Sequence, residues 1–178
     1  FLARQGYPPG AYPAVYIVDV SDPANPVELH VEEYFAAESP AGIDVCGDLL
    51  YISTVHGDPY NRVEVIDVSD PTNPIHFVNP ELLYEIPAYD VFVDGNSIYV
   101  SAGSNGLRVY RHPSSSHSFE LVGVLETPGD TFTAEVYGDL AFIGDGEGLQ
   151  VAYVRQSYKD WGGRRGKSLI INECWDPI

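Results

Sequence analysis

The chain has no methionine, only two cysteines and only nine basic residues in a length of 178. The chain has 26 Asp and Glu residues against these nine Lys and Arg residues, which gives a formal net charge of −17. Such a charge opposes binding to nucleic acid, which requires a basic surface, and it also opposes docking on anionic lipid. We therefore expect no nucleic-acid partner and an acidic surface that favours solubility.

Long apolar runs are also missing. No stretch approaches the ~18 to 20 consecutive apolar residues that a helix needs to cross a bilayer, so we predict no membrane span. Since the chain begins at Phe1 without an initiator methionine, we expect a processed or excised piece. The hydrophobic content of 44% is typical of a globular chain.

The two cysteines, Cys46 and Cys174, are too few and too far apart for a zinc site or a redox CxxC motif. In an oxidising compartment they could form one disulfide bond. The alternative is two separate buried thiols, because free cysteine packs as a small apolar residue. Both interpretations stay open at the level of sequence.

One ten-residue stretch occurs twice. Ile17 to Pro26 and Val65 to Pro74 each begin with two β-branched residues and continue Asp-Val-Ser-Asp-Pro-x-Asn-Pro. Val and Ile favour a pleated, half-buried strand, whereas proline removes a backbone donor that a strand ladder needs. Each copy therefore predicts a strand followed by a forced turn, and the near-copy 48 residues on predicts a repeat architecture.

Shorter signals repeat at similar spacing. A glycine followed by Asp or Asn and a short apolar run occurs at Gly47, Gly95 and Gly138, which is typical of a tight hairpin. No segment shows the sustained 3.6-residue periodicity of a capped helix. A period of ~40 to 50 residues with four short strands is what a β-propeller blade requires. We therefore predict an all-β fold of propeller blades, each with four antiparallel strands.

The predicted strands do not complete a ring. We expect an extended arm over residues 1–13, propeller repeats over residues 14–154, and a basic loop with a closing strand over residues 155–178. This gives about fourteen strands where four closed blades need about sixteen, so we predict an incomplete ring or about four blades. An open ring leaves a blade face bare. The remaining propeller chain, the two ends of this chain, or strands from neighbouring copies would have to cover it.

The doubled motif, the glycine turns before it and the Gly-Leu-x-Val stretches at Gly106 and Gly148 resemble the LVIVD-repeat β-propellers. The resemblance covers residues 14–154, although the strands at Val109 and Val151 lack the Asp-Pro and Asn-Pro turn that follows the first two copies. It implies a propeller of the secreted or cell-surface proteins of bacteria and archaea. Because propellers host many unrelated functions, it implies no particular activity.

The basic residues gather near the end of the sequence. Arg155 to Lys167 carries five of the nine, together with Trp161. Arg164 and Arg165 could grip a carboxylate while Trp161 anchors the contact. An acidic protein partner, including a neighbouring copy, would suit this patch, and the alternative is a solvated glycine-rich loop.

Metal and catalytic signals are few. Asp145 and Glu147 place two carboxylates in one tight loop, and such oxygen ligands suit Ca²⁺. Their spacing matches no specific calcium motif, and Asp is commoner in turns than at metal sites. We therefore expect no cofactor, and these two residues are the calcium candidates. The five histidines share no repeat position, and no GxSxG, HExxH or P-loop motif occurs.

These observations lead to two functional hypotheses. The first is a non-enzymatic, secreted or cell-surface propeller that acts as a binding or structural scaffold, within a larger propeller or an oligomer. The alternative is a fragment of a propeller enzyme, a hydrolase or an oxidoreductase, with its site on loops at the central axis. A cluster of His and carboxylates at the axis would favour the enzyme, whereas a bare axis with a large intermolecular interface would favour the scaffold.

Overall fold

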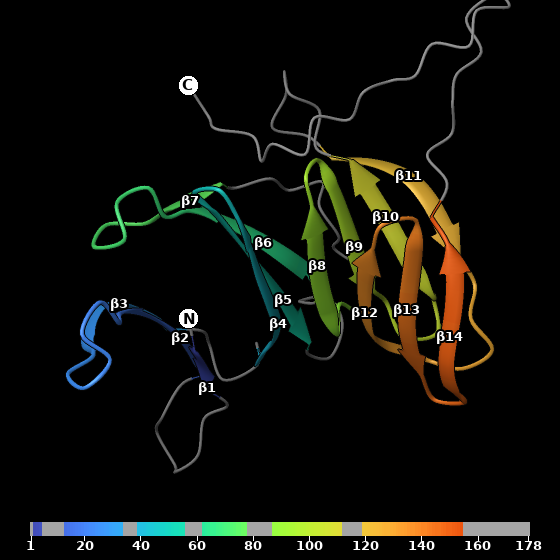
Figure 1. Cartoon of the computed structure of the whole chain (residues 1–178), viewed down its shortest axis with the longest axis horizontal. Coiled ribbons are helices and arrows are strands. Elements are labelled where there is room, and N and C mark those ends of the chain that lie inside the picture. Colours follow the sequence, from blue (N-terminus) through green and yellow to red (C-terminus); the bar gives the residue numbers. More distant parts are fainter. Residues whose placement is uncertain are drawn as a thin grey trace, which may run out of the picture.

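The computed structural model describes residues 2–4, 13–33, 39–55, 62–77, 87–111 and 119–154. These residues form fourteen β-strands and no helix, which confirms the predicted all-β class. The strands make four antiparallel sheets that follow one another in chain order, from blue to orange in Figure 1. No helix in this part of the chain is long and apolar enough to cross a membrane.

We call the four sheets blades 1 to 4. Blade 1 contains β1 (Leu2–Arg4), β2 (Ala14–Asp19) and β3 (Val27–Glu33). Blade 2 contains β4 (Ser39–Cys46), β5 (Leu49–Val55), β6 (Arg62–Asp67) and β7 (Ile75–Phe77). Blade 3 contains β8 (Asp90–Asp94), β9 (Ser97–Ser101), β10 (Leu107–Arg111) and β11 (Glu120–Leu125). Blade 4 contains β12 (Thr131–Tyr137), β13 (Leu140–Asp145) and β14 (Gly148–Tyr153).

Each blade is a simple up-and-down sheet in which strands adjacent in sequence pair with each other. The doubled motif lies on β2 and on β6, which is the third strand of blade 2. By this equivalence blade 1 holds strands two to four of a blade, and blade 4 holds strands one to three. Within the predicted arm of residues 1–13, residues 2–4 form β1, which pairs with β2.

The glycine turns between the first two strands of blades 2, 3 and 4 have the expected geometry. Gly47, Gly95 and Gly138 have φ values of 59°, 56° and 60°. In blade 2 the flanking residues Cys46 and Leu49 pair directly, so the hairpin loop contains two residues. Such a loop requires positive φ at its first position, which glycine adopts without steric cost.

The doubled motif forms the same turn twice. Asp19 Oδ1 accepts a hydrogen bond of 2.8 Å from the backbone N–H of Ser21, and Asp67 Oδ1 accepts one of 2.9 Å from Ser69. The donated hydrogen bonds of Ser21 lower the pKa of Asp19. These short-range bonds stop the third strand and start the turn to the fourth, because a side-chain oxygen that bonds the backbone two residues on replaces the ladder.

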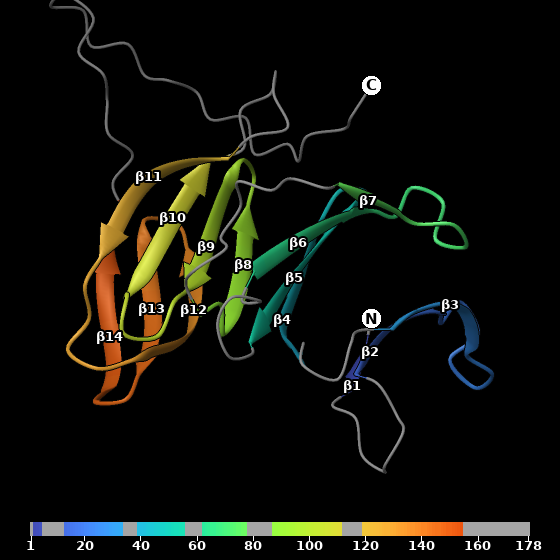
Figure 2. The same ribbon diagram turned by 180° about the vertical axis from the view of Figure 1, so that it is seen from behind.

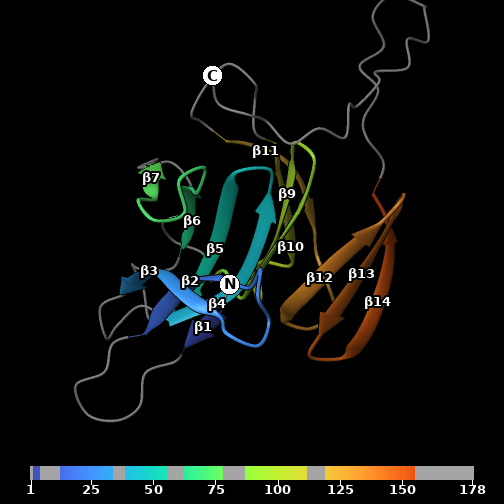
Figure 3. The same cartoon turned by 60° about the vertical axis from the view of Figure 1, so that its left-hand side comes forward.

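The blades touch mainly through their first strands. In the described residues β4 contacts β8, and β8 contacts β12, while β1 contacts β4 at the beginning of the chain. The sheets spread apart from this side, so that blade 1 and blade 4 stand at opposite ends of an open arc (Figures 2 and 3). The arrangement matches the predicted incomplete propeller.

The hydrophobic core lies between the blades rather than within one of them. The three clusters each join two blades: Val15 with Leu50, Ile52 and Ile66; Tyr51 and Val65 with Val91, Val100 and Tyr110; and Tyr99 and Leu107 with Ala134, Ala141 and Ile143. Blades 2 and 3 thus have both faces apolar and need a neighbour on each. The prediction that a blade cannot bury its faces alone is confirmed in blades 2 and 3.

Candidate functional site

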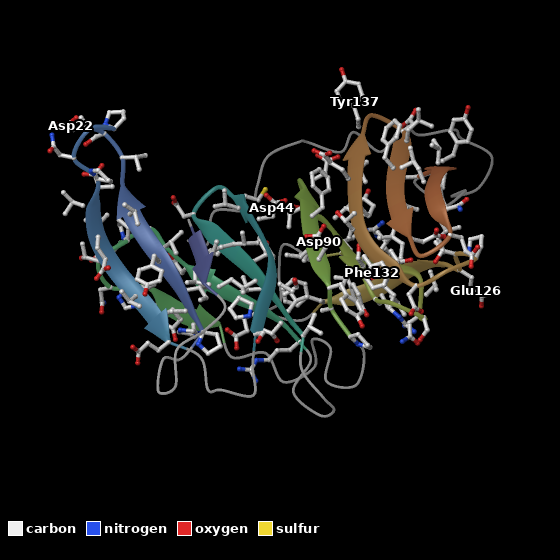
Figure 4. The ribbon with its side chains drawn as sticks, turned by 90° about the horizontal axis from the view of Figure 1, so that it is seen from below. Asp22, Asp44, Asp90, Glu126, Phe132 and Tyr137 are labelled. Carbon is white, nitrogen blue, oxygen red and sulfur yellow. The ribbon has the colours of Figure 1, made fainter. Side chains whose placement is uncertain are left out.

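Two carboxylates lie where the first strands of blades 2, 3 and 4 meet. Asp44 belongs to β4 and Asp90 to β8, and both lie between neighbouring sheets in Figure 4. Asp44 Oδ2 accepts a hydrogen bond of 2.6 Å from the backbone N–H of Val93 on the next blade. Because β8 is the edge strand of blade 3, this N–H has no strand partner on that side. Asp44 therefore ties blade 2 to blade 3.

Asp90 makes the equivalent connection one blade further on. Its Oδ2 atom accepts a hydrogen bond of 2.7 Å from the hydroxyl of Thr133 on β12, and its carboxylate also accepts one from the backbone N–H of Ala134. Its Oδ1 atom accepts a third, of 3.0 Å, from the N–H of Val91 on its own strand. The carboxylate is thus surrounded by donors, and two of them belong to blade 4.

The environment of these carboxylates is partly buried and negatively charged. Burial raises the pKa of Asp90, the donors from Thr133, Val91 and Ala134 oppose that rise, and the charge of Asp44 adds to it. Burial also raises the pKa of Tyr51 to about 12, again with a contribution from Asp44. The described residues hold no group of three or more His, Cys, Asp or Glu side chains arranged to bind a metal ion.

The first strands approach each other closely at Gly42. Its N–H donates a hydrogen bond of 2.8 Å to Ser53 Oγ on β5. A Cβ atom at this position would lie 2.7 Å from the Cα atom of Asp90, which is closer than real Cβ contacts come. The missing side chain of Gly42 therefore makes room for Asp90, and the two blades pack backbone to backbone.

We expect Asp90→Ala to lower the free energy of unfolding by about 1–3 kcal/mol, because Thr133 and Ala134 lose their acceptor. Asp90→Asn keeps an acceptor oxygen but does not titrate. A carboxyl group whose pKa is raised by folding stabilises the fold fully below its unfolded value of 3.8, and that contribution is lost as the pH rises through the folded value. The Asn variant should therefore gain stability relative to wild type as the pH rises above 3.8.

Urea unfolding of the three proteins at several pH values measures this. Asp94→Ala is the matched control, because Asp94 is an exposed residue on the same strand and should change stability by less than about 0.5 kcal/mol. Equal losses for Asp90→Ala and Asp94→Ala would contradict a connecting role for Asp90.

The calcium candidates lie in the hairpin loop between β13 and β14. Asp145 Oδ1 accepts hydrogen bonds from the N–H groups of Glu147 (2.9 Å) and Gly148 (2.8 Å), and Oδ2 accepts one from Gly129 (3.2 Å). Burial acts to raise the pKa of Asp145, but these donors outweigh it and the pKa is lowered. Asp145 thus stabilises the turn through these hydrogen bonds, and Glu147 is exposed. The calcium site stays a prediction.

Cys46 lies at the end of β4, on the buried side of the contact between blades 2 and 3. It is 7% exposed, and its Sγ atom is 3.8 Å from the carbonyl oxygen of Gly95. It is not a free thiol in the structure. Cys174 lies outside the described residues, so a Cys46–Cys174 disulfide stays a prediction.

The predicted contact patch, with Trp161, Arg164 and Arg165, also lies outside the described residues. A common surface formed by these three side chains stays a prediction. The same holds for the closing strand predicted within residues 155–178.

One polar cluster was not predicted from the sequence. Glu32 Oε2 on β3 lies 3.4 Å from His30 Nε2 on the same strand and 3.1 Å from His76 Nε2 on β7 of the next blade. The two histidines occupy different positions of the repeat, since Pro26 and Pro74 are equivalent and His30 and His76 follow them by four and two residues. Repeat comparison alone could not have paired them.

The comparisons with known proteins bear on the fold. A family model described as LVIVD repeat matches residues 14–31 and 40–79. Among solved structures, the crystal structure of the computationally designed Ika8 protein is similar at 12% sequence identity, with a TM-score of 0.50. The match covers 73% of this chain and 37% of that chain, so this chain spans little more than a third of its length. No curated protein sequence matches this chain.

At such low identity the structural likeness concerns the fold alone, and the family match rests on the motif itself. The two matched segments contain β2 to β7, including both copies of the Ser-Asp-Pro turn. Over these residues the chain thus matches the LVIVD repeat, as its doubled motif predicts.

Proposed function

We propose that this protein is a non-enzymatic scaffold, secreted or held at the cell surface, that binds a protein partner within a larger propeller or an assembly. One observation carries the proposal: the carboxylates on the first strands are used to join blades. Asp44 accepts from Val93 and Asp90 from Thr133, each on the following blade. Their oxygens thus hold the architecture together.

The enzyme alternative needs a different arrangement at the same place. A catalytic pair of carboxylates points an oxygen at substrate, so its truncation to Ala leaves no donor of the protein without an acceptor. In the described first strands Asp44 and Asp90 bond to the backbone and hydroxyl donors of the next blade, and no histidine lies on these strands. The loss of stability expected for Asp90→Ala separates the two functions.

The basic patch supplies the binding part of the proposal. The sequence has a net charge of −17, and Arg155 to Lys167 contains five of its nine basic residues, which suits this segment to an acidic protein. Arg164 and Arg165 would pair with carboxylates of the partner, and Trp161 would be the apolar anchor. Contacts of this kind weaken as salt is added.

Fractionation of the source cells tests the location. We expect the chain in the culture medium, or on intact cells where an added protease that cannot enter removes it. A cytoplasmic protein of the same cells serves as the control for leakage and must survive the protease. Recovery of the chain with that control, protected from protease until lysis, would contradict the proposal.

A further inference from the structure

Blade 4 exposes an apolar sheet face. Phe142 is 38% exposed, Val151 55% and Leu149 70%, although all three are large hydrophobic residues on strands. Phe142 pairs with Val151 and Gly144 with Leu149, so these side chains share one face of the sheet. The other face, with Ala141 and Ile143, is fully buried against blade 3.

The same positions are buried in the two preceding blades. Counting from the glycine turn, Phe142 is equivalent to Tyr51 in blade 2 and Tyr99 in blade 3, which are 3% and 5% exposed. Likewise Leu149 is equivalent to Val63 and Leu107, which are 4% and 2% exposed. In blades 2 and 3 the following blade covers these side chains. The face of blade 4 is therefore a blade-docking face that no described sheet covers.

An acidic residue accompanies this face, as in blade 2. Glu135 on β12 stands three residues before the glycine of its turn, where blade 2 has Asp44. Asp44 accepts the edge N–H of Val93 from the next blade, whereas Glu135 is exposed. Blade 4 thus has the same two features by which blade 2 contacts blade 3. It has an apolar sheet face, and beside this face a carboxylate that can accept a backbone hydrogen bond from the edge strand of a neighbour.

The other end of the arc offers a matching surface. In blade 1, Val15 packs against blade 2, and Tyr16 and Val18 alternate with it on the opposite, outer face, where they are half-buried. Tyr16 pairs with Val31, which adds a further apolar side chain to that face. Among the described strands β1 is the edge of blade 1, so its outward backbone N–H groups can meet an acceptor such as Glu135.

We propose that the open face of blade 4 docks on the outer face of blade 1 in a second copy of the chain, so that copies associate head to tail. This deepens the proposed scaffold function by naming its partner, and it rests on that function. The contact continues the interface that already joins blades 1 to 4 within one copy. A head-to-tail contact produces a closed ring when its rotation divides the circle and a filament when it does not.

The salt dependence of association distinguishes this contact from binding through the basic residues. Each copy carries −17, so copies repel, and salt screens that repulsion over a Debye length of about 8 Å at 0.15 M. The apolar contact itself is not weakened by salt. Association should therefore strengthen when the salt concentration is raised, whereas binding through Trp161, Arg164 and Arg165 should weaken.

Sedimentation velocity of the purified full chain, over a roughly hundredfold concentration range at low and high salt, tests the proposal. We expect species larger than the 19.5 kDa monomer that grow with concentration and with salt. Val151→Asp and, separately, Leu149→Asp should each weaken association at least about tenfold. The matched control is Val124→Asp, because Val124 is 51% exposed on β11, the last strand of blade 3, away from both of these faces.

Three results would overturn the inference. The first is a 19.5 kDa monomer at every concentration and salt, which would mean that something other than a second copy covers blade 4. The second is association that both blade 4 variants retain. The third is association that salt weakens, which would assign it to the basic patch and leave the proposed scaffold function standing. Circular dichroism of each variant confirms that it is folded.

Discussion

Gly42→Ala is expected to lower the free energy of unfolding by about 3 kcal/mol or more. The added methyl group would lie 2.7 Å from the Cα of Asp90 and 2.8 Å from Ser53 Oγ. A flexible side chain can move aside, but a backbone atom of a neighbouring strand cannot move without carrying its blade. Relief of the clash would therefore push blade 3 from blade 2 and stretch the hydrogen bond from Val93 to Asp44.

Guanidinium unfolding followed by fluorescence and by circular dichroism measures the effect, and agreement between the two probes tests two-state behaviour. Gly123→Ala is the matched control, also a glycine on a strand. Its Cβ would meet only the side chain of Val109, at 3.8 Å, which is an ordinary contact. We expect this control to stay within about 0.5 kcal/mol of wild type. A small effect of Gly42→Ala would mean that the blades are not packed backbone to backbone there.

The close approach at Gly42 is part of a pattern across the repeats. Counted from the glycine turns, Gly42 in blade 2, Asp90 in blade 3 and Thr133 in blade 4 are equivalent positions. Glycine leaves room, the Asp90 carboxylate fills it, and Thr133 donates to that carboxylate from the next blade. Three different residues at one repeat position thus fit together as consecutive neighbours.

This explains which features the sequence could predict. The turns at Asp19 and Asp67 depend on residues two positions apart, so the local motif determines them and both copies form as expected. The connection from Asp44 to Val93 joins residues 49 positions apart. Asp44 is equivalent to Phe92 in the next blade, so a comparison of repeats gives no sign that its carboxylate has a partner.

The tyrosines also show what the sequence alone cannot predict. Their strand positions predict packing between blades, and Tyr51, Tyr99 and Tyr110 are indeed buried there. Tyr137 and Tyr153, both on strands of blade 4, are exceptions at 84% and 75% exposure, and in Figure 4 Tyr137 points away from the sheet. Sequence pattern assigns a residue to a face of a blade, but the presence of a neighbouring blade decides whether that face is covered.

Ile52→Ala should cost about 2–5 kcal/mol of unfolding free energy, and the loss should be concentrated at the contact between blades 1 and 2. Ile52 is 0% exposed and packs with Val15, Leu50 and Ile66 in the cluster that joins these two blades. Removing its three outer carbons leaves a cavity that its neighbours cannot fill, because Val15 and Ile66 are β-branched and stiff.

Among the described residues blade 1 has three strands and one neighbouring blade, so weakening this cluster removes a larger share of its packing than in a blade with a neighbour on each side. Hydrogen exchange of the β2 amides should accelerate more than that of the β9 amides, which lie between blades 2 and 4. Ile75→Ala is the control, because Ile75 is 60% exposed on β7 and should change little. Uniform acceleration in every blade would instead mean that the four blades unfold as a single cooperative unit, and that blade 1 is held by more than this one cluster.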